Sequence, residues 1–184
     1  MLTSRLWSYC EQHLCEFSIN TLISIPINKN QFDIDGSVHL YHLRFMKVTI
    51  LSKPELYKLI KTHSLSSNSA VISFADEGCE FLDFPPNIDV LKIEFDDIRP
   101  AYLTKERIGE LLPEATLIAS FVDRKIKEGK DIICQCDYGI SRSAGLAAAI
   151  LQRYAHKGID VFSDYRYTPN QIVFNKVYKE LMKL

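Results

Sequence analysis

Residues 132–145 read IICQCDYGISRSAG, and this stretch decides the fold. Its apolar start is typical of a short buried strand, and the Ala-rich residues 143–156 predict a helix. Between them lies a tight loop that begins at Cys136 and contains Gly139. A strand that leads through a loop into a helix gathers backbone N–H groups at the positive end of the helix. The stretch therefore predicts an anion site that fits a phosphoryl group.

Four residues of this stretch suit phosphate chemistry. Gly139 lets the backbone curl, and the planar guanidinium of Arg142 can bind two phosphate oxygens at once. The positive field that binds an anion also favours the thiolate of Cys136, which makes this thiol the expected nucleophile. The Ser143 hydroxyl, one residue into the helix, is expected to hydrogen-bond the sulfur. A Cys-x5-Arg pattern with this Gly and Ser arises by chance only about 0.001 times in a chain of this composition.

The rest of the chain alternates between strand and helix patterns from Met46 onward. Strands are expected at residues 46–51, 70–74, 90–95 and 132–133, and helices at 53–63, 104–127, 143–156 and 170–184. Thr104 is the expected N-cap of the second helix, and Pro113 interrupts or restarts that helix. This alternation predicts an α/β fold with a central, mostly parallel sheet of about four to five strands flanked by helices.

The same patterns divide the chain into two parts. Residues 46–184 are expected to form a single domain, and residues 1–45, which show no sustained periodicity, a poorly defined N-terminal extension. Because Met46 opens the first clear strand, an alternative start at this methionine is a further hypothesis.

The composition limits the class of function. With 22 basic and 23 acidic side chains the chain is nearly neutral, which argues against a nucleic-acid binder held mainly by charge. Its apolar runs are shorter than the roughly 18 residues of a membrane-spanning helix. The 5 cysteines are an odd number and do not pair by spacing, so we expect a cytoplasmic protein with free thiols that does not contact a membrane. No metal is expected, because the candidate ligands match no zinc-finger spacing. These candidates are Cys10, His13, Cys15, His39 and His42.

Residues 90–184 resemble the catalytic domain of the cysteine-based protein tyrosine phosphatases, in particular the small dual-specificity branch. The signature of that family is His-Cys-x5-Arg-Ser/Thr between a strand and a helix, and Cys136, Arg142 and Ser143 match it in register. The Pro-Asn pair before the last helix is similar to the family as well. The resemblance covers about half of the chain, and the patterns from Met46 onward are compatible with the remainder of that fold.

The resemblance implies a metal-independent phosphotyrosine or dual-specificity phosphatase that needs no cofactor and acts on a phosphorylated protein or peptide. Cys136 would be the nucleophile and Asp97, after the strand at 90–95, the general acid. Arg142 would hold the phosphate, and Ser143 would support the sulfur as a leaving group. The implied phosphate-binding loop comprises Asp137, Tyr138, Gly139, Ile140, Ser141 and Arg142.

Two loop positions depart from the family. Gln135 stands where the family usually has His, so the groups that support the loop differ. Asp137 stands where lipid-directed members carry Lys or Arg, and its carboxylate would repel a polyphosphorylated inositol head group. The pattern therefore favours a singly phosphorylated substrate.

Alternatives stand beside this interpretation. Asp96 is the other candidate acid, although counting from the apolar end of the strand selects Asp97. Cys134 can act as a thiol that traps an oxidised Cys136, although a packed core residue is the simpler interpretation. The rival function is a phosphoprotein-binding module without turnover. Arsenate reduction or sulfur transfer on a reactive cysteine is a second enzymatic rival.

Overall fold

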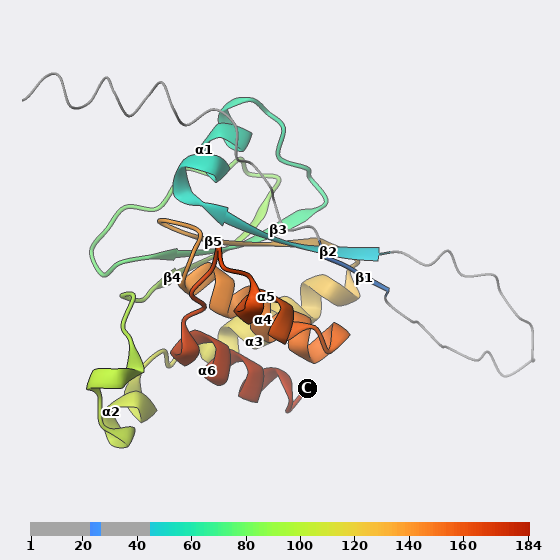
Figure 1. Cartoon of the computed structure of the whole chain (residues 1–184). Coiled ribbons are helices and arrows are strands. Elements are labelled where there is room, and N and C mark those ends of the chain that lie inside the picture. The colour runs from blue at the N-terminus through green and yellow to red at the C-terminus, as the bar shows by residue number, and fades with distance from the viewer. Residues whose placement is uncertain (1–22, 27–44) are drawn as a thin grey trace, which may run out of the picture.

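The computed structural model describes residues 23–26 and 45–184 and arranges them around a five-stranded sheet (Figure 1). Its strands are β1 (Ile23–Pro26), β2 (Phe45–Ser52), β3 (Ser69–Ala75), β4 (Asp89–Glu94) and β5 (Asp131–Cys136). The spatial order is β1-β2-β5-β3-β4, with β1 antiparallel to β2 and all other neighbours parallel. The prediction of an α/β fold with a mostly parallel sheet is confirmed.

Helices cover both faces of this sheet. The helical elements are α1 (Lys53–Lys61), the 3-10 turn η1 (Pro100–Tyr102), α2 (Lys105–Glu110), α3 (Ala115–Lys127), α4 (Arg142–Ala155), α5 (Gly158–Ser163) and α6 (Gln171–Leu181). In Figure 1, α1 lies on one face and α3, α4, α5 and α6 lie on the other. A strand covered on both faces reads as a continuous apolar run, and every residue of β3 is buried.

Local signals set the helix ends. Ser52 caps α1 and exchanges hydrogen bonds with Glu55 in a capping box. Thr104 caps α2 by accepting from the N–H of Arg107, so the predicted cap is confirmed. Pro113 falls between the end of α2 and the start of α3, which confirms the predicted interruption.

The carboxyl ends of the parallel strands meet at one edge of the sheet, where ligand sites of α/β folds usually lie. Cys136, the last residue of β5, is paired with Ser52, the last residue of β2. The helix that follows, α4, is buried along residues 142–151. The core therefore fixes both the strand that enters the loop and the helix that leaves it.

Three elements were not predicted, and one of them is the 3-10 turn η1. Strand β1 lies within residues 1–45 and adds an antiparallel edge to the sheet. A strand of 4 residues is too short to show a period, which explains why the sequence patterns missed it. Helix α5 follows α4 closely, because His156 turns the chain with a left-handed φ of 57°. The domain boundary at Met46 stays a prediction, since residues 1–22 and 27–44 lie outside the described part of the chain.

Within residues 23–26 and 45–184, the helices are too short or too polar to cross a membrane.

Candidate active site

The loop between β5 and α4 is held from two sides by backbone hydrogen bonds. At the start of α1, the N–H of Lys53 donates to the carbonyl of Asp137 over 3.1 Å. On the other side, the N–H of Thr168 donates to the carbonyl of Ile140, also over 3.1 Å. Because these contacts join the loop to distant segments of the chain, its conformation is set before any ligand binds.

Gly139 is required by both its conformation and its surroundings. Its φ is 70°, in the left-handed region that favours glycine. A Cβ at this position would lie 2.7 Å from the backbone nitrogen of Ser52 and 3.0 Å from the carbonyl carbon of Leu51. The loop therefore packs directly on the junction between β2 and α1.

The sulfur of Cys136 lies 3.1 Å from the hydroxyl oxygen of Ser143. Cys136 is 2% exposed, and Ser143 is buried in the first turn of α4. Cys134, two residues earlier on β5, is buried as well. Burial, and secondarily the charge of Cys136, raises the pKa of the Cys134 thiol. Cys134 is therefore protonated at neutral pH.

Arg142 is buried at the start of α4 among oxygen atoms. Its Nη1 donates to the carbonyl of Phe95 and its Nη2 to the Asp137 carboxylate, each over 2.6 Å. Nη1 also lies 2.7 Å from Asp76 Oδ1, a charge contact without the alignment of a hydrogen bond. The buried Nε has no hydrogen-bond partner in the described part of the chain. The Nε–H of Arg142 is thus available to a ligand.

Asp76 was not assigned to the site by sequence reasoning. It follows β3 directly, and its position at the carboxyl end of a parallel strand was the signal that could have marked it.

The two aspartates after β4 have different partners. Asp97 Oδ1 accepts hydrogen bonds from the Ser141 hydroxyl over 2.7 Å and from the Asn170 amide over 2.8 Å. Asp96 Oδ1 accepts instead from the backbone N–H of Glu77, over 2.9 Å, in the segment after β3. The structure therefore ties Asp97 to the loop between β5 and α4, and Asp96 to the segment after β3.

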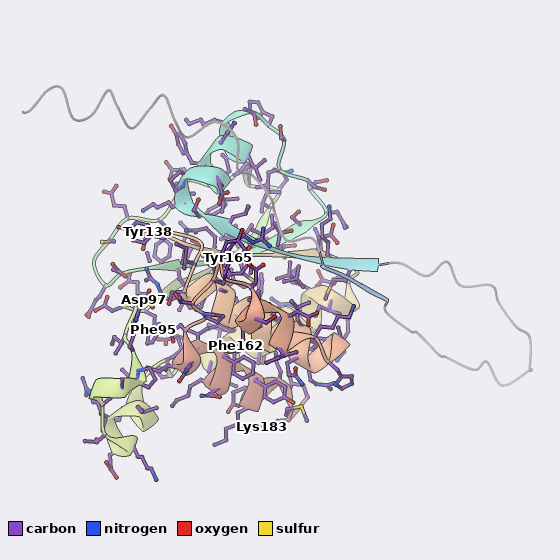
Figure 2. The ribbon with its side chains drawn as sticks, in the orientation of Figure 1. Phe95, Asp97, Tyr138, Phe162, Tyr165 and Lys183 are labelled. Atoms are coloured by element: carbon purple, nitrogen blue, oxygen red, sulfur yellow. The ribbon has the colours of Figure 1, made fainter. Side chains whose placement is uncertain are left out.

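Two side chains of the loop face solvent. Tyr138 is 81% exposed and Ile140 is 42% exposed. Figure 2 shows Tyr138 and Asp97 at the same end of the sheet. Tyr138 and Ile140 thus give the loop an exposed, partly apolar surface.

Gln135, the residue before Cys136, is held inside the sheet by a side-chain hydrogen bond. It is buried, and its amide oxygen accepts a short hydrogen bond from the Ser73 hydroxyl. The two residues are paired across β5 and β3, so this bond joins two central strands one residue before Cys136. The buried polar groups satisfy each other inside the sheet.

Asn170 is a second residue whose role sequence reasoning missed. Its amide nitrogen donates to Asp97 and, over 3.0 Å, to the carbonyl of Ile98. Its amide oxygen accepts from the N–H groups of Ile172 and Val173, which caps α6. The Pro-Asn pair was visible in the sequence as a helix start. The contact with Asp97 joins segments 73 residues apart and needs the fold to be seen.

Among the described residues, no group of three or more His, Cys, Asp or Glu side chains is placed to hold a metal ion. The candidate zinc ligands named from the sequence lie outside these residues: Cys10, His13, Cys15, His39 and His42.

No family model and no curated protein sequence matches the chain. Solved structures do match it. The structure of human DUSP28 aligns with a TM-score of 0.52 at 15% identity, over 74% of this chain and 88% of that chain. The structure of a human tyrosine phosphatase-like serine/threonine/tyrosine-interacting protein aligns with a TM-score of 0.51 at 15% identity, over 74% and 93% of the two chains. At such identity the likeness is one of fold, and the chain has the fold of the small, cysteine-based dual-specificity phosphatases.

Proposed function

We propose that the chain is a cytoplasmic, cysteine-dependent phosphatase that removes phosphate from tyrosine, or from serine, threonine and tyrosine, in proteins or peptides. The observation that carries the proposal is the buried Nε of Arg142, which has no partner among the described residues, in the same loop as the Cys136–Ser143 contact of 3.1 Å. A buried N–H group without a partner is costly. A phosphate oxygen beside the Cys136 sulfur would satisfy it.

In the first step, the Cys136 thiolate attacks phosphorus on the side opposite the leaving oxygen. The S–P bond forms as the P–O bond breaks, and Asp97 gives its proton to the leaving oxygen. Loop amides at the start of α4, together with Arg142 Nε, hold the equatorial oxygens. Because the loop is fixed by backbone contacts, these donors are in place before the substrate arrives.

In the second step, water attacks the cysteinyl-phosphate. Asp97, now a carboxylate, accepts a proton from that water as the new P–O bond forms and the S–P bond breaks. The Ser143 hydroxyl donates to the departing sulfur and stabilises the thiolate. Arg142 and the N-terminus of α4 supply positive charge to the phosphate, so turnover is expected to be metal-independent.

The carboxylates beside Arg142 favour a substrate with a single phosphate. Asp137 contacts Nη2 over 2.6 Å, and Asp76 lies 2.7 Å from Nη1. Their negative charges offset the guanidinium and repel further phosphate groups. A phosphorylated side chain is thus a better candidate than a polyphosphorylated head group.

A phosphate-binding module without turnover is the second candidate. One protein of this fold is named as an interacting protein rather than as a phosphatase. A binding module, however, has no use for the Cys136–Ser143 contact or for an acid tied to the loop.

The proposal is tested by measuring hydrolysis of p-nitrophenyl phosphate and of a phosphopeptide panel by the full chain. We expect activity that persists in EDTA and is blocked by vanadate. Cys136→Ser should abolish turnover and still bind phosphate analogues, because the amides and Arg142 remain. Cys79→Ser, at an exposed cysteine, is the matched control and should stay active. Near-normal hydrolysis by Cys136→Ser would overturn the mechanism, and phosphate binding without turnover in the wild type would favour the binding module.

A further inference from the structure

A cavity of about 680 Å³ adjoins the phosphate loop, and we call it the flank pocket. This volume lies in the range of pockets that take small molecules, and it leaves room for a side chain of a bound peptide. Three segments form it: the chain after Asp97, helix α5, and the turn that leads into α6. Most of its lining is apolar, from Ile98, Pro100, Ala101, Phe162, Tyr167 and Pro169.

The flank pocket shares two residues with the candidate active site. Ser141 and Asn170 line it, and the same two side chains hold the Asp97 carboxylate. A phosphorylated residue bound in the loop therefore has this cavity next to it. The group attached to that residue, rather than the phosphate itself, lies within reach of the flank pocket.

The charge of the flank pocket differs from that of the loop. Arg99 is exposed and lines the cavity, and the lining contains no carboxylate. Within the described part of the chain, no ion pair engages Arg99. Around the loop, in contrast, the charged neighbours of the phosphate position include Asp76, Asp97 and Asp137. A carboxylate of a substrate is repelled near the loop and attracted at the flank pocket.

We propose that the flank pocket selects the peptide around the phosphorylated residue, an inference that rests on the proposed function. An apolar side chain next to that residue enters the cavity, and Arg99 binds a carboxylate beside it. The preferred substrate is then a singly phosphorylated peptide with an apolar residue and an acidic residue adjacent to the phosphorylated one. Arg99 is a specificity-determining residue in this arrangement and takes no part in the chemical step.

Two peptides test this proposal directly. They share one phosphorylated residue and one apolar neighbour, which is followed by Glu in the first peptide and by Lys in the second. The measured quantity is the ratio of kcat/KM for the Glu peptide to that for the Lys peptide, which cancels any change in the chemical step. We expect a ratio of about 5 for the wild type, the size typical of an exposed ion pair, and a ratio below one for Arg99→Glu.

The matched control is Lys58→Glu, which makes the same charge change on α1, across the sheet (Figure 1). It should keep the wild-type ratio. A second variant, Ala101→Phe, fills the cavity and should raise KM more for a peptide with a large apolar neighbour than for one with Ala there. If the chain binds these peptides without turnover, the ratio of their two Kd values is measured in place of the kcat/KM ratio.

Equal Glu-to-Lys ratios in the wild type and in Arg99→Glu would overturn the proposed role of the flank pocket in selecting peptides. If Arg99→Glu lowers kcat/KM by the same factor for both peptides, that role is also overturned, because Arg99 would then act through the position of Asp97. Hydrolysis of p-nitrophenyl phosphate separates the two proposals. If that hydrolysis persists while the peptide ratios are equal, only the flank pocket fails. If wild-type hydrolysis is absent, the proposed function fails, and the Kd ratios still decide the pocket.

Discussion

Replacing Gly139 with alanine perturbs the loop between β5 and α4 where it packs against the end of β2. A φ of 70° costs a residue with a Cβ about 1–2 kcal/mol. The new Cβ would also stand 2.7 Å from the nitrogen of Ser52 and 3.0 Å from the carbonyl carbon of Leu51. Both are backbone atoms at the end of β2 and cannot rotate away, and such overpacking costs about 1–3 kcal/mol. We expect Gly139→Ala to lower the free energy of unfolding by about 2–5 kcal/mol.

Substitutions at two other glycines separate the cost of the backbone conformation from the cost of steric overlap. Gly78 has a similar φ of 75° but nothing within 4 Å of its Cβ position, so Gly78→Ala should lose only about 1–2 kcal/mol. Gly109 lies in α2 with open space around it, and Gly109→Ala should gain about 0.5–1 kcal/mol. Urea unfolding followed by circular dichroism measures all three. A loss for Gly139→Ala no larger than that for Gly78→Ala would refute the packing of the loop against Ser52.

Three further outcomes are expected. Asp97→Asn should lower kcat by about 10²–10⁴-fold for an ester whose leaving group needs a proton, and far less for an activated ester. Asp96→Asn should lower kcat less than Asp97→Asn does, and the opposite order would assign the acid to Asp96. Cys134 should resist alkylation in the folded chain, because burial raises its pKa, and should react after unfolding, as followed by mass spectrometry; equal rates in both states would contradict this. The hydrogen bond from Lys125 lowers the pKa of Asp89, so its stabilisation is present above the ordinary aspartate pKa and is lost as pH falls through the lowered value. Asp89→Asn should therefore cost less than about 1 kcal/mol at neutral pH and nothing in strong acid, and a difference that persists in acid would exclude the ion pair as its cause.

The fold was predictable because its main elements carry strong local patterns. Strand β3 is mostly apolar, with Ser69 and Ser73 as its polar residues, and it is buried throughout because both of its faces are covered. The Ala-rich helix α4 is buried along residues 142–151, which its composition allows, since small side chains let a helix approach the sheet closely. Strand β1 was not predicted, because it has 4 residues and depends on pairing with β2.

The centre of the candidate site was predictable for a different reason. Cys136, Arg142 and Ser143 lie within eight residues of one strand-loop-helix unit, so a local sequence motif can specify their arrangement. Asp97 could be chosen over Asp96 by counting from the strand end, and the structure ties Asp97 to Ser141 of the loop.

The residues that contact Arg142 and Asp97 from other segments could not be predicted from such a motif. Asp76 meets Arg142 from the end of β3, and Asn170 meets Asp97 from the turn before α6. These contacts join segments far apart in the chain. They depend on the order of strands in the sheet and on the packing of α6, which no local pattern specifies.

Transfer of phosphate to Cys136 is the step on which the proposed chemistry depends most directly. It is measured by quenching the full chain in acid during turnover of a phosphorylated substrate and locating the modification by mass spectrometry of the digested protein. We predict one added phosphoryl group on Cys136, with Cys134 in the same peptide unmodified, and no such adduct in Cys136→Ser. Steady turnover without an adduct on Cys136, or with the adduct on another residue, would contradict the assignment of the nucleophile.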